Sequence, residues 1–264
     1  YPVVNAAFGS EWSPGVDNDI RMTILHSALS GVAGYYSALD EFPKIIYPFS
    51  NEREIFYMNI NSFVGSTSYL GTLAHELQHA IHWAGDAGEE TWVNEGLSEV
   101  AKGLAGYGLS FIDYFIESPG TPLTSWPSNR GSALPSYGAA SLFMEYLAQH
   151  YGGPESLSKL VLRPEDGIEG VTAYLQSLDS RKTFQDVFQD WLVANYLDSQ
   201  DVGRYTYEGL NVSVSPTNTI LEHGLHSGTV GQYAGEYIEV RLDAGDALVS
   251  FQGQTETPLL PTSI

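Results

Sequence analysis

The segment HELQHAIHW, residues 75–83, constrains the fold more than any other part of the chain. On an α-helix, residues four apart lie on one face, about 6 Å apart along the axis. His75 and His79 can therefore present ring nitrogens to one metal ion. Glu76 is then placed beside that ion, where its carboxylate can take a proton from a bound water. The segment predicts a helix that carries part of a metal site.

A third protein ligand has to come from another segment, because catalytic zinc characteristically uses three and keeps a fourth position for water. Gly85 and Gly88 predict the end of the first helix, and TWVNEGLSEV predicts a second one with Glu95 and Glu99 on one face. If the second helix folds back on the first, Glu95 completes a set of two histidines and one carboxylate. Glu99 is then expected to accept a hydrogen bond from the far nitrogen of a ligand histidine, which fixes the orientation of that ring.

Two rival ligand sets do not fit the spacing. His82 comes seven residues after His75, roughly 10 Å along the helix axis, which is too far for both to bind one tetrahedral ion. In the other common zinc protease pattern, a glycine and then a third histidine follow the pair at three-residue intervals, but here those positions hold His82 and Gly85. The remaining histidines are expected to be packed or solvated, and they are His26, His150, His223 and His226.

Composition narrows the functional classes. The 264 residues include 11 Lys and Arg against 32 Asp and Glu, a net charge of −21, so no nucleic acid or anionic membrane is expected as a partner. The absence of cysteine excludes disulfides and thiolate metal sites, which leaves histidine and carboxylate as metal ligands. No apolar run approaches the ~20 residues of a membrane-spanning helix, so membrane insertion is not expected. The chain opens at Tyr1 without a signal-like segment and is expected to be a processed or excised piece.

An acidic turn near the N-terminus is a second, less specific metal candidate. Asp17, Asn18 and Asp19 could bind Ca²⁺ through their side-chain oxygens. They lack the spacing of the twelve-residue calcium loop, however, and turn chemistry explains them equally well. Calcium therefore stays an option that no specific motif supports.

The pattern along the chain predicts an α+β fold in two parts. Residues 21–25 and 54–60 are expected to form strands in a turn-rich region, and residues 66–195 to form amphipathic helices around a common core. Beyond residue 201, the segments YEGLNVSVS, EYIEVRL and ALVSFQG are expected to form short strands. The expected division is one domain over residues 1–200 and a β-rich C-terminal module over residues 201–264, truncated at its end.

With these motifs the chain resembles the gluzincin metallopeptidases, the clan of thermolysin and the zinc aminopeptidases. AHELQHAIHW and WVNEGLSE carry the resemblance, because in the clan HExxH is followed by a glutamate ligand on the next helix. Within the clan, the chain looks most like the secreted bacterial neutral metallopeptidases around hyicolysin and immune inhibitor A. The resemblance implies a thermolysin-like zincin catalytic domain, with a small N-terminal sheet, an HExxH helix and a helical C-terminal lobe. It also implies a secreted, extracellular protein.

The resemblance extends to PSYGAASLFMEYLAQHYGG, which is similar to the gluzincin segment in which a tyrosine stabilises the oxyanion of the tetrahedral intermediate. Tyr137 is at the matching position, although Gly138 follows at once where aminopeptidases have a short spacer. The alternative interpretation is a core tyrosine at the start of a helix. Upstream, the strand expected over residues 54–60 occupies the place of the clan's strand that runs along the cleft and pairs with substrate.

The resemblance implies a zinc endopeptidase with one catalytic Zn²⁺ held by His75, His79 and Glu95. Glu76 would act as the general base and Tyr137 would support the oxyanion. NSFVGSTSYLGTLAHE contains no match to the amine-binding motif of the exopeptidases, which favours an endopeptidase acting on a protein or peptide substrate. Two alternatives stay open: a zincin fold retained for binding or adhesion with little or no catalysis, and a zinc hydrolase that does not act on peptides. The sequence does not indicate the oligomeric state.

Overall fold

The computed structural model describes residues 1–199, 203–242 and 248–253, and its elements form a mixed α+β arrangement, as the sequence predicts. The α-helices are α1 (Pro2–Phe8), α2 (Thr67–Gly85), α3 (Thr91–Lys102), α4 (Ile112–Glu117), α5 (Leu134–His150), α6 (Ser158–Val161), α7 (Gly167–Ser177) and α8 (Phe184–Leu197). The strands are β1 (Thr23–Ser27), β2 (Gly34–Tyr36), β3 (Ile55–Asn59), β4 (Asn218–Ile220) and β5 (Ile238–Val240). Short helical turns occupy Ala38–Glu41, Gly103–Tyr107, Arg130–Ala133 and Pro154–Ser156.

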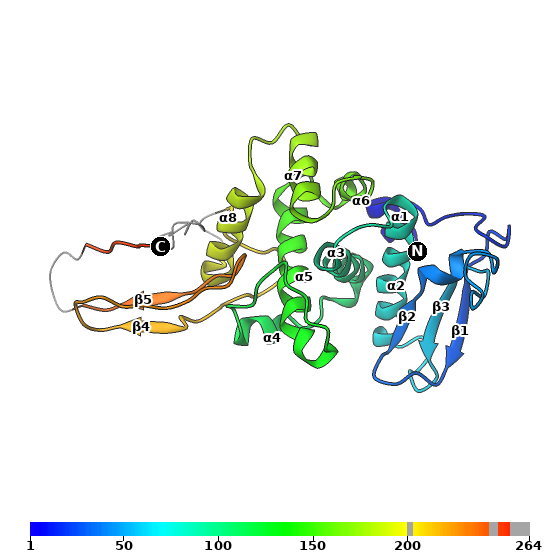
Figure 1. Ribbon diagram of the computed structural model, residues 1–264, viewed down its shortest axis with the longest axis horizontal. Coiled ribbons are helices and arrows are strands. Elements are labelled where there is room, and N and C mark those ends of the chain that lie inside the picture. The colour runs from blue at the N-terminus through cyan, green and yellow to red at the C-terminus, as the bar shows by residue number, and fades with distance from the viewer. Residues whose placement is uncertain (200–202, 243–247, 254–264) are drawn as a thin grey trace.

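These elements follow one another across the molecule in three zones (Figure 1). The sheet of β1, β2 and β3 lies at one end with α2 beside it, and α3 and α5 occupy the middle. The ribbon of β4 and β5 extends beyond α8 at the other end. None of the helices in the described part of the chain is both long and apolar enough to cross a bilayer.

The N-terminal sheet has the order β1-β3-β2, with β1 parallel and β2 antiparallel to β3. Both expected strands are present, as β1 and β3. The sequence does not predict β2, because GYY is too short to show alternation and the surrounding glycines favour turns. Since β1 and β2 pair with both edges of β3, the expectation that residues 54–60 pair with a substrate is wrong. Among the described strands, β2 is the edge strand next to α2.

The first helix, α1, is also absent from the sequence-based expectations. Its seven residues, PVVNAAF, are too few to establish a helical period. Pro2 in the first turn suits a helix start, where its missing N–H costs nothing. Val4, Ala7 and Phe8 are buried, so α1 is held by packing of its apolar face.

The helices expected over residues 66–195 are confirmed as α2 to α8. Ser66 begins α2 by accepting a hydrogen bond from the backbone N–H of Tyr69 at 3.2 Å. Thr183 and Asp186 form a reciprocal capping box at the start of α8. Local capping and apolar periodicity agree here, which is why these helices are readable from the sequence.

Helices α3 and α5 approach closely because Gly96 has no side chain. A Cβ atom on Gly96 would lie 2.7 Å from both the carbonyl oxygen of Ala140 and Cγ of Met144. On α5, a Cβ atom on Gly138 would collide with the carbonyl oxygen of Phe111, just before α4. The two glycines therefore let α5 pack against α3 and α4 at once, which brings the start of α5 toward the residues on α3.

Residues 207–215 form no strand, so that prediction is wrong. Their alternation is real, because Val212 and Val214 are buried between exposed neighbours. However, the N–H of Val212 donates to Oδ2 of Asp198 at 2.9 Å, and the N–H of Val214 donates to the carbonyl oxygen of Asn195 at 3.0 Å. The segment packs on the C-terminal end of α8, whose acceptors take the place of a neighbouring strand.

The ribbon matches the expected C-terminal strands only in part. β5 lies within EYIEVRL, whereas β4, its parallel partner, lies where no strand is expected. Residues 248–253 of the third expected strand have no regular structure, and Ala247 lies outside the described residues. Tyr207 and Tyr237 belong to the same apolar core as the helices. The division of the chain at residue 200 stays a prediction.

Candidate metal centre

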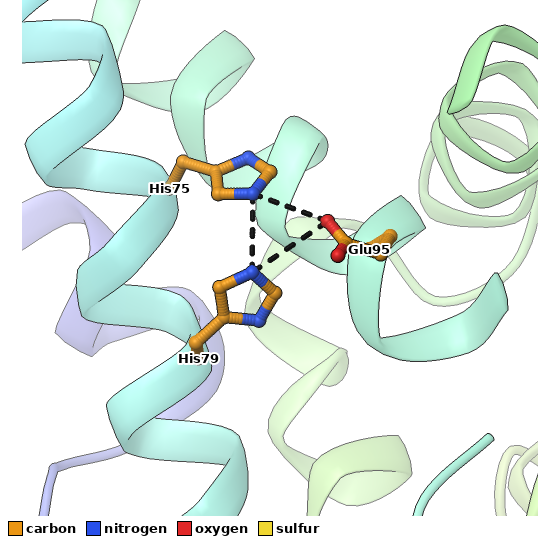
Figure 2. Close-up of side chains that lie close together, drawn as sticks. All are labelled: His75, His79 and Glu95. Carbon is orange, nitrogen blue, oxygen red and sulfur yellow. Dashed lines mark hydrogen bonds and ion pairs between the residues drawn. The ribbon is translucent and has the colours of Figure 1, made fainter. Parts of the chain in front are cut away.

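The packing of α2 against α3 brings three potential ligands together (Figure 2). His75 and His79 lie one turn apart on α2, and Glu95 faces them from α3. The two Nε2 atoms are 3.1 Å apart. Oε2 of Glu95 lies 3.2 Å from Nε2 of His75 and 3.6 Å from Nε2 of His79. Within the described residues, this is the group of histidines and carboxylates that could hold a metal ion.

The far nitrogen of each imidazole ring is already engaged. Nδ1 of His75 lies 3.1 Å from Oε1 of Glu99, and Nδ1 of His79 contacts Oδ1 of Asn94. Because a carboxylate or amide oxygen can only accept, each Nδ1 carries the proton of the neutral ring. Each Nε2 is therefore left with a lone pair that points into the centre.

The third ligand atom is also an acceptor without a proton. Oε2 of Glu95 is buried and accepts no hydrogen bond in spite of its short contacts with the two rings. Two nitrogen lone pairs and one carboxylate oxygen thus converge, and a buried acceptor without a donor is costly. A cation at the centre satisfies all three atoms at once, so the residues fit a metal ion.

The charges around the centre favour a bound cation in another way. Burial of the His75 ring opposes its protonation, but the neighbouring carboxylates of Glu95 and Glu99 outweigh burial and, without a metal ion, raise the pKa of His75 to about 10. Burial likewise opposes ionisation of Glu95, yet His75 and His79 hold the pKa of its carboxyl well below its usual range. A site that holds positive charge this firmly would exchange a proton for a metal ion on binding.

Glu99 lies where the four-residue spacing on α3 places it. Its side chain is buried, and its Oε1 faces Nδ1 of His75. Its Oε2 accepts a hydrogen bond from the backbone N–H of Ser110 at 2.7 Å and lies 3.4 Å from Nζ of Lys102. Both carboxylate oxygens are therefore fixed, so Glu99 can hold the His75 ring in one orientation.

Sequence reasoning missed the residues that orient His79. Besides Asn94, Oγ of Ser98 lies 3.0 Å from Nδ1 of His79 and 2.5 Å from Oε1 of Gln78. Asn94 and Ser98 are four residues apart on α3, as are Glu95 and Glu99. That shared spacing is the signal that could have revealed them.

Glu76 points from α2 toward the sheet. Its side chain is buried, and its Oε2 accepts a hydrogen bond from the backbone N–H of Tyr36 at 2.8 Å. Tyr36 lies on β2, the edge strand next to α2, so this bond fixes the carboxylate against that strand. The charge of Glu76 also contributes to the raised pKa of His75, after burial and the hydrogen bonds to that ring.

Tyr137 has features both of a core tyrosine and of an oxyanion donor, the two interpretations that the sequence leaves open. Its ring centroid lies 5.4 Å from that of Phe111 and 4.9 Å from that of Trp126. Its hydroxyl donates to Oε1 of Glu95 at 3.2 Å, so it lies beside a potential metal ligand. The glycine that directly follows, Gly138, is explained by the close approach of α5 to the residues before α4.

The acidic turn near the N-terminus is organised without a metal. Oδ2 of Asp17 lies 3.2 Å from Nε of Arg53, and Oδ2 of Asp19 lies 2.6 Å from Nη2 of Arg21. The N–H of Asp19 donates to Oδ1 of Asp17 at 2.8 Å, a bond typical of a turn. Arginines neutralise both carboxylates, so the geometry supports the turn interpretation and not a calcium site.

No protein-family model and no curated protein sequence matches the chain. A functional assignment therefore depends on the geometry of the centre formed by His75, His79 and Glu95 and on the residues around it.

Proposed function

We propose that the chain is a zinc-dependent endopeptidase with a thermolysin-like zincin fold. The observation that carries the proposal is the convergence of Nε2 of His75, Nε2 of His79 and Oε2 of Glu95. Imidazole nitrogens suit zinc, whereas calcium and magnesium prefer oxygen ligands alone. Three protein ligands also leave the fourth position of a tetrahedral zinc ion for water or substrate, as catalytic sites require.

Zinc held at this site would supply Lewis acidity, which polarises a peptide carbonyl and lowers the pKa of water. Glu76 would take the proton from the attacking water and pass it to the leaving amine. The hydrogen bond from Tyr36 holds its carboxylate in one orientation for that task. Tyr137, whose hydroxyl donates to Glu95 in the absence of substrate, would donate it to the developing oxyanion.

The surrounding geometry supports a peptide substrate. β2 is a short antiparallel edge strand next to Glu76, whose carboxylate takes the N–H of Tyr36, and an extended peptide could pair with the remaining main-chain groups of that edge. The resemblance to secreted neutral metallopeptidases supports an extracellular location.

Casein hydrolysis tests the proposal. The purified protein should contain zinc and cleave casein, lose the activity on treatment with a chelator, and regain it when zinc is added. The variant Glu76→Gln should keep zinc and lose activity. A zinc-loaded protein that cleaves neither casein nor a random peptide library would contradict the proposal and favour a binding module on the same fold. Cleavage of esters or amides but not of peptides would identify a different zinc hydrolase.

A further inference from the structure

A cavity of about 400 Å³ lies at the start of α3. Its wall combines the turn into α3 with the segment that follows α4, and it is lined by Glu89, Glu90, Thr91, Trp92, Thr124 and Trp126. A hollow of this size is within the range of small-ligand sites and holds a long amino-acid side chain.

The cavity adjoins the metal centre through two of its walls. Thr91 precedes Glu95 by four residues on α3, which is about 6 Å along the helix axis. Trp126 packs edge-on against Tyr137, with ring centroids 4.9 Å apart, and Tyr137 donates to Glu95. A peptide cleaved at the metal centre can therefore extend a side chain close to its scissile bond into the cavity.

The cavity and its surroundings carry an excess of negative charge. Two acidic residues, Glu89 and Glu90, belong to the wall. Asp166 and Asp86 lie close enough to add to the effect of burial, which raises the pKa of Glu89 to about 7. In the part of the chain that the structure describes, no lysine or arginine forms an ion pair with any of the four.

One of these carboxylates has a buried oxygen without a donor. The Glu89 side chain is only 1% exposed. Its Oε1 accepts hydrogen bonds from the N–H groups of Gly167 and Glu90 at 2.8 and 2.6 Å, but its Oε2 accepts none. Nε2 of His82 lies 4.0 Å from Oε2, too far for a hydrogen bond, and also has no partner. This oxygen is therefore out of reach of a ligand, and Glu89 acts on the cavity through its charge.

A metal ion does not fit this arrangement. A calcium site needs several oxygens converging on one point. Among the described residues, His75, His79 and Glu95 converge closely enough for a metal ion, and no such group includes Glu89 or Glu90. An extended cation can instead reach the exposed carboxylate of Glu90 within the field of Glu89, and Trp126 belongs to the same wall.

We propose that this cavity binds the side chain of an arginine or lysine residue close to the scissile bond of the peptide substrate. The proposal rests on the peptidase function above and names the substrate class for it. Glu89 and Glu90 supply the charge, and Trp126 links the cavity to Tyr137 beside the metal centre.

Cleavage of paired peptides measures the effect on catalysis. Two series of fluorogenic peptides are compared. In each pair of peptides, a single position holds arginine in one series and its neutral isostere citrulline in the other. That position is varied along both sides of the scissile bond. At one position, kcat/KM should be about 10 to 100-fold higher for arginine, as expected for a charge-assisted hydrogen bond. Glu90→Gln should lower that ratio about tenfold, and Glu89→Gln should lower it as well. The matched control Glu222→Gln removes an exposed charge after β4 and should leave the ratio unchanged.

A ratio near one at every position, or a ratio that neither Glu89→Gln nor Glu90→Gln lowers, would overturn the proposal. Melting temperatures of both variants check their folding. Glu90 is exposed and its glutamine keeps an acceptor for Nε1 of Trp92, so Glu90→Gln remains informative if Glu89→Gln is unstable.

Binding without catalysis separates this proposal from the peptidase function. Saturation-transfer NMR on chelator-treated protein should detect Nα-acetylarginine amide but not Nα-acetylcitrulline amide, with the signal weakened by Glu90→Gln. If no peptide is cleaved and this preference persists, the peptidase proposal fails, and only the binding of a cationic side chain in the cavity stands. Equal signals for the two amides would overturn the cavity proposal. A rise in melting temperature with calcium chloride that Glu89→Gln abolishes would overturn it in favour of a metal site.

Discussion

The α2–α3 pair carries two buried polar clusters that differ in how their charges converge. In the metal centre, Oε2 of Glu95 lies 3.2 Å from Nε2 of His75. In the cavity wall, Oε2 of Glu89 lies 4.0 Å from Nε2 of His82. Each cluster leaves a buried carboxylate oxygen without a hydrogen bond. The first places its acceptors around one point and suits a compact ion, whereas the second spreads them out and suits a longer cation.

The difference follows from positions along the helices. The ligand histidines, His75 and His79, share one face of α2, while His82 lies near the same face but seven residues beyond His75, roughly 10 Å farther along the helix axis. Glu95 lies within α3, but Glu89 lies in the turn before it. Regular helix geometry therefore builds the metal centre, and the turn between the helices builds the cavity.

Removal of a ligand should break the metal centre and leave the cavity intact. In His79→Ala, one of the three converging atoms is lost, so zinc should be absent after dialysis and peptidase activity should fall to background. Metal analysis by mass spectrometry measures the zinc content. His82→Ala is the matched control, since that histidine lies outside the ligand set, and it should retain zinc. Full zinc occupancy in His79→Ala would remove the proposed site.

Loss of the base should separate chemistry from metal binding. Glu76→Gln keeps the shape and the acceptor for the N–H of Tyr36 but cannot take a proton. We expect kcat to fall roughly 10² to 10⁴-fold with zinc content unchanged. Near-normal turnover in the zinc-loaded variant would transfer the role of base to another residue.

The hydroxyl of Tyr137 connects the two clusters, because its ring touches Trp126 while its oxygen reaches Glu95. If it donates to the oxyanion, Tyr137→Phe should lower kcat roughly 10² to 10³-fold, with KM and zinc content little changed. A tyrosine with a packing role alone would lose only about 1 kcal/mol of stability and keep its rate. Measuring kcat and the melting temperature of this variant together decides between the two roles.

Substitution of Glu99 measures how far zinc affinity depends on a residue that contacts a ligand histidine and not the ion itself. In Glu99→Ala, Nδ1 of His75 loses its acceptor, so zinc affinity should weaken roughly 10 to 100-fold. Competition with a fluorescent zinc chelator measures the change. Glu169→Ala, an exposed carboxylate on α7, is the control and should have no effect. Affinity equal to that of the wild type would limit Glu99 to a structural role.

The metal centre could be predicted from the sequence because the spacing of its residues within each helix determines which side chains share a face. Four-residue spacing on a helix places His75 with His79 and Glu95 with Glu99, and one glycine-rich turn between the helices leaves few ways to pack them. The same spacing holds for Asn94 and Ser98, which went unrecognised because amide and hydroxyl groups are common on helices for many reasons.

The rest of the fold depends on contacts between distant segments. β2 is a strand only because β3 lies beside it, and residues 207–215 avoid strand pairing only because the end of α8 offers acceptors. The cavity likewise joins Glu90 to Trp126, which belongs to another segment. No local period in the sequence records such pairings, so the wall of the cavity could not be predicted from the sequence.

The last effect we expect concerns the stability of the protein when the cavity holds no ligand. Burial, with repulsion from Asp166 and Asp86, raises the pKa of Glu89 from 4.5 to about 7. The folded protein therefore binds more protons than the unfolded chain between these values, so stability should fall as pH rises through this window. The loss at higher pH is on the order of a few kcal/mol at most.

Glu89→Gln removes that titration and keeps an acceptor for the N–H groups of Gly167 and Glu90. The variant should therefore gain melting temperature relative to wild type between about pH 5 and pH 8, by several degrees for a stability change of this order. The exposed Glu155 provides the control Glu155→Gln, which should show no such gain. An arginine amide bound in the cavity should reduce the difference in melting temperature between the variant and the wild type. Its positive charge offsets the negative charge of Glu89, which only the wild type has. A melting difference that does not change with pH would show that Glu89 is ionised at no cost, with its unpaired oxygen satisfied by water.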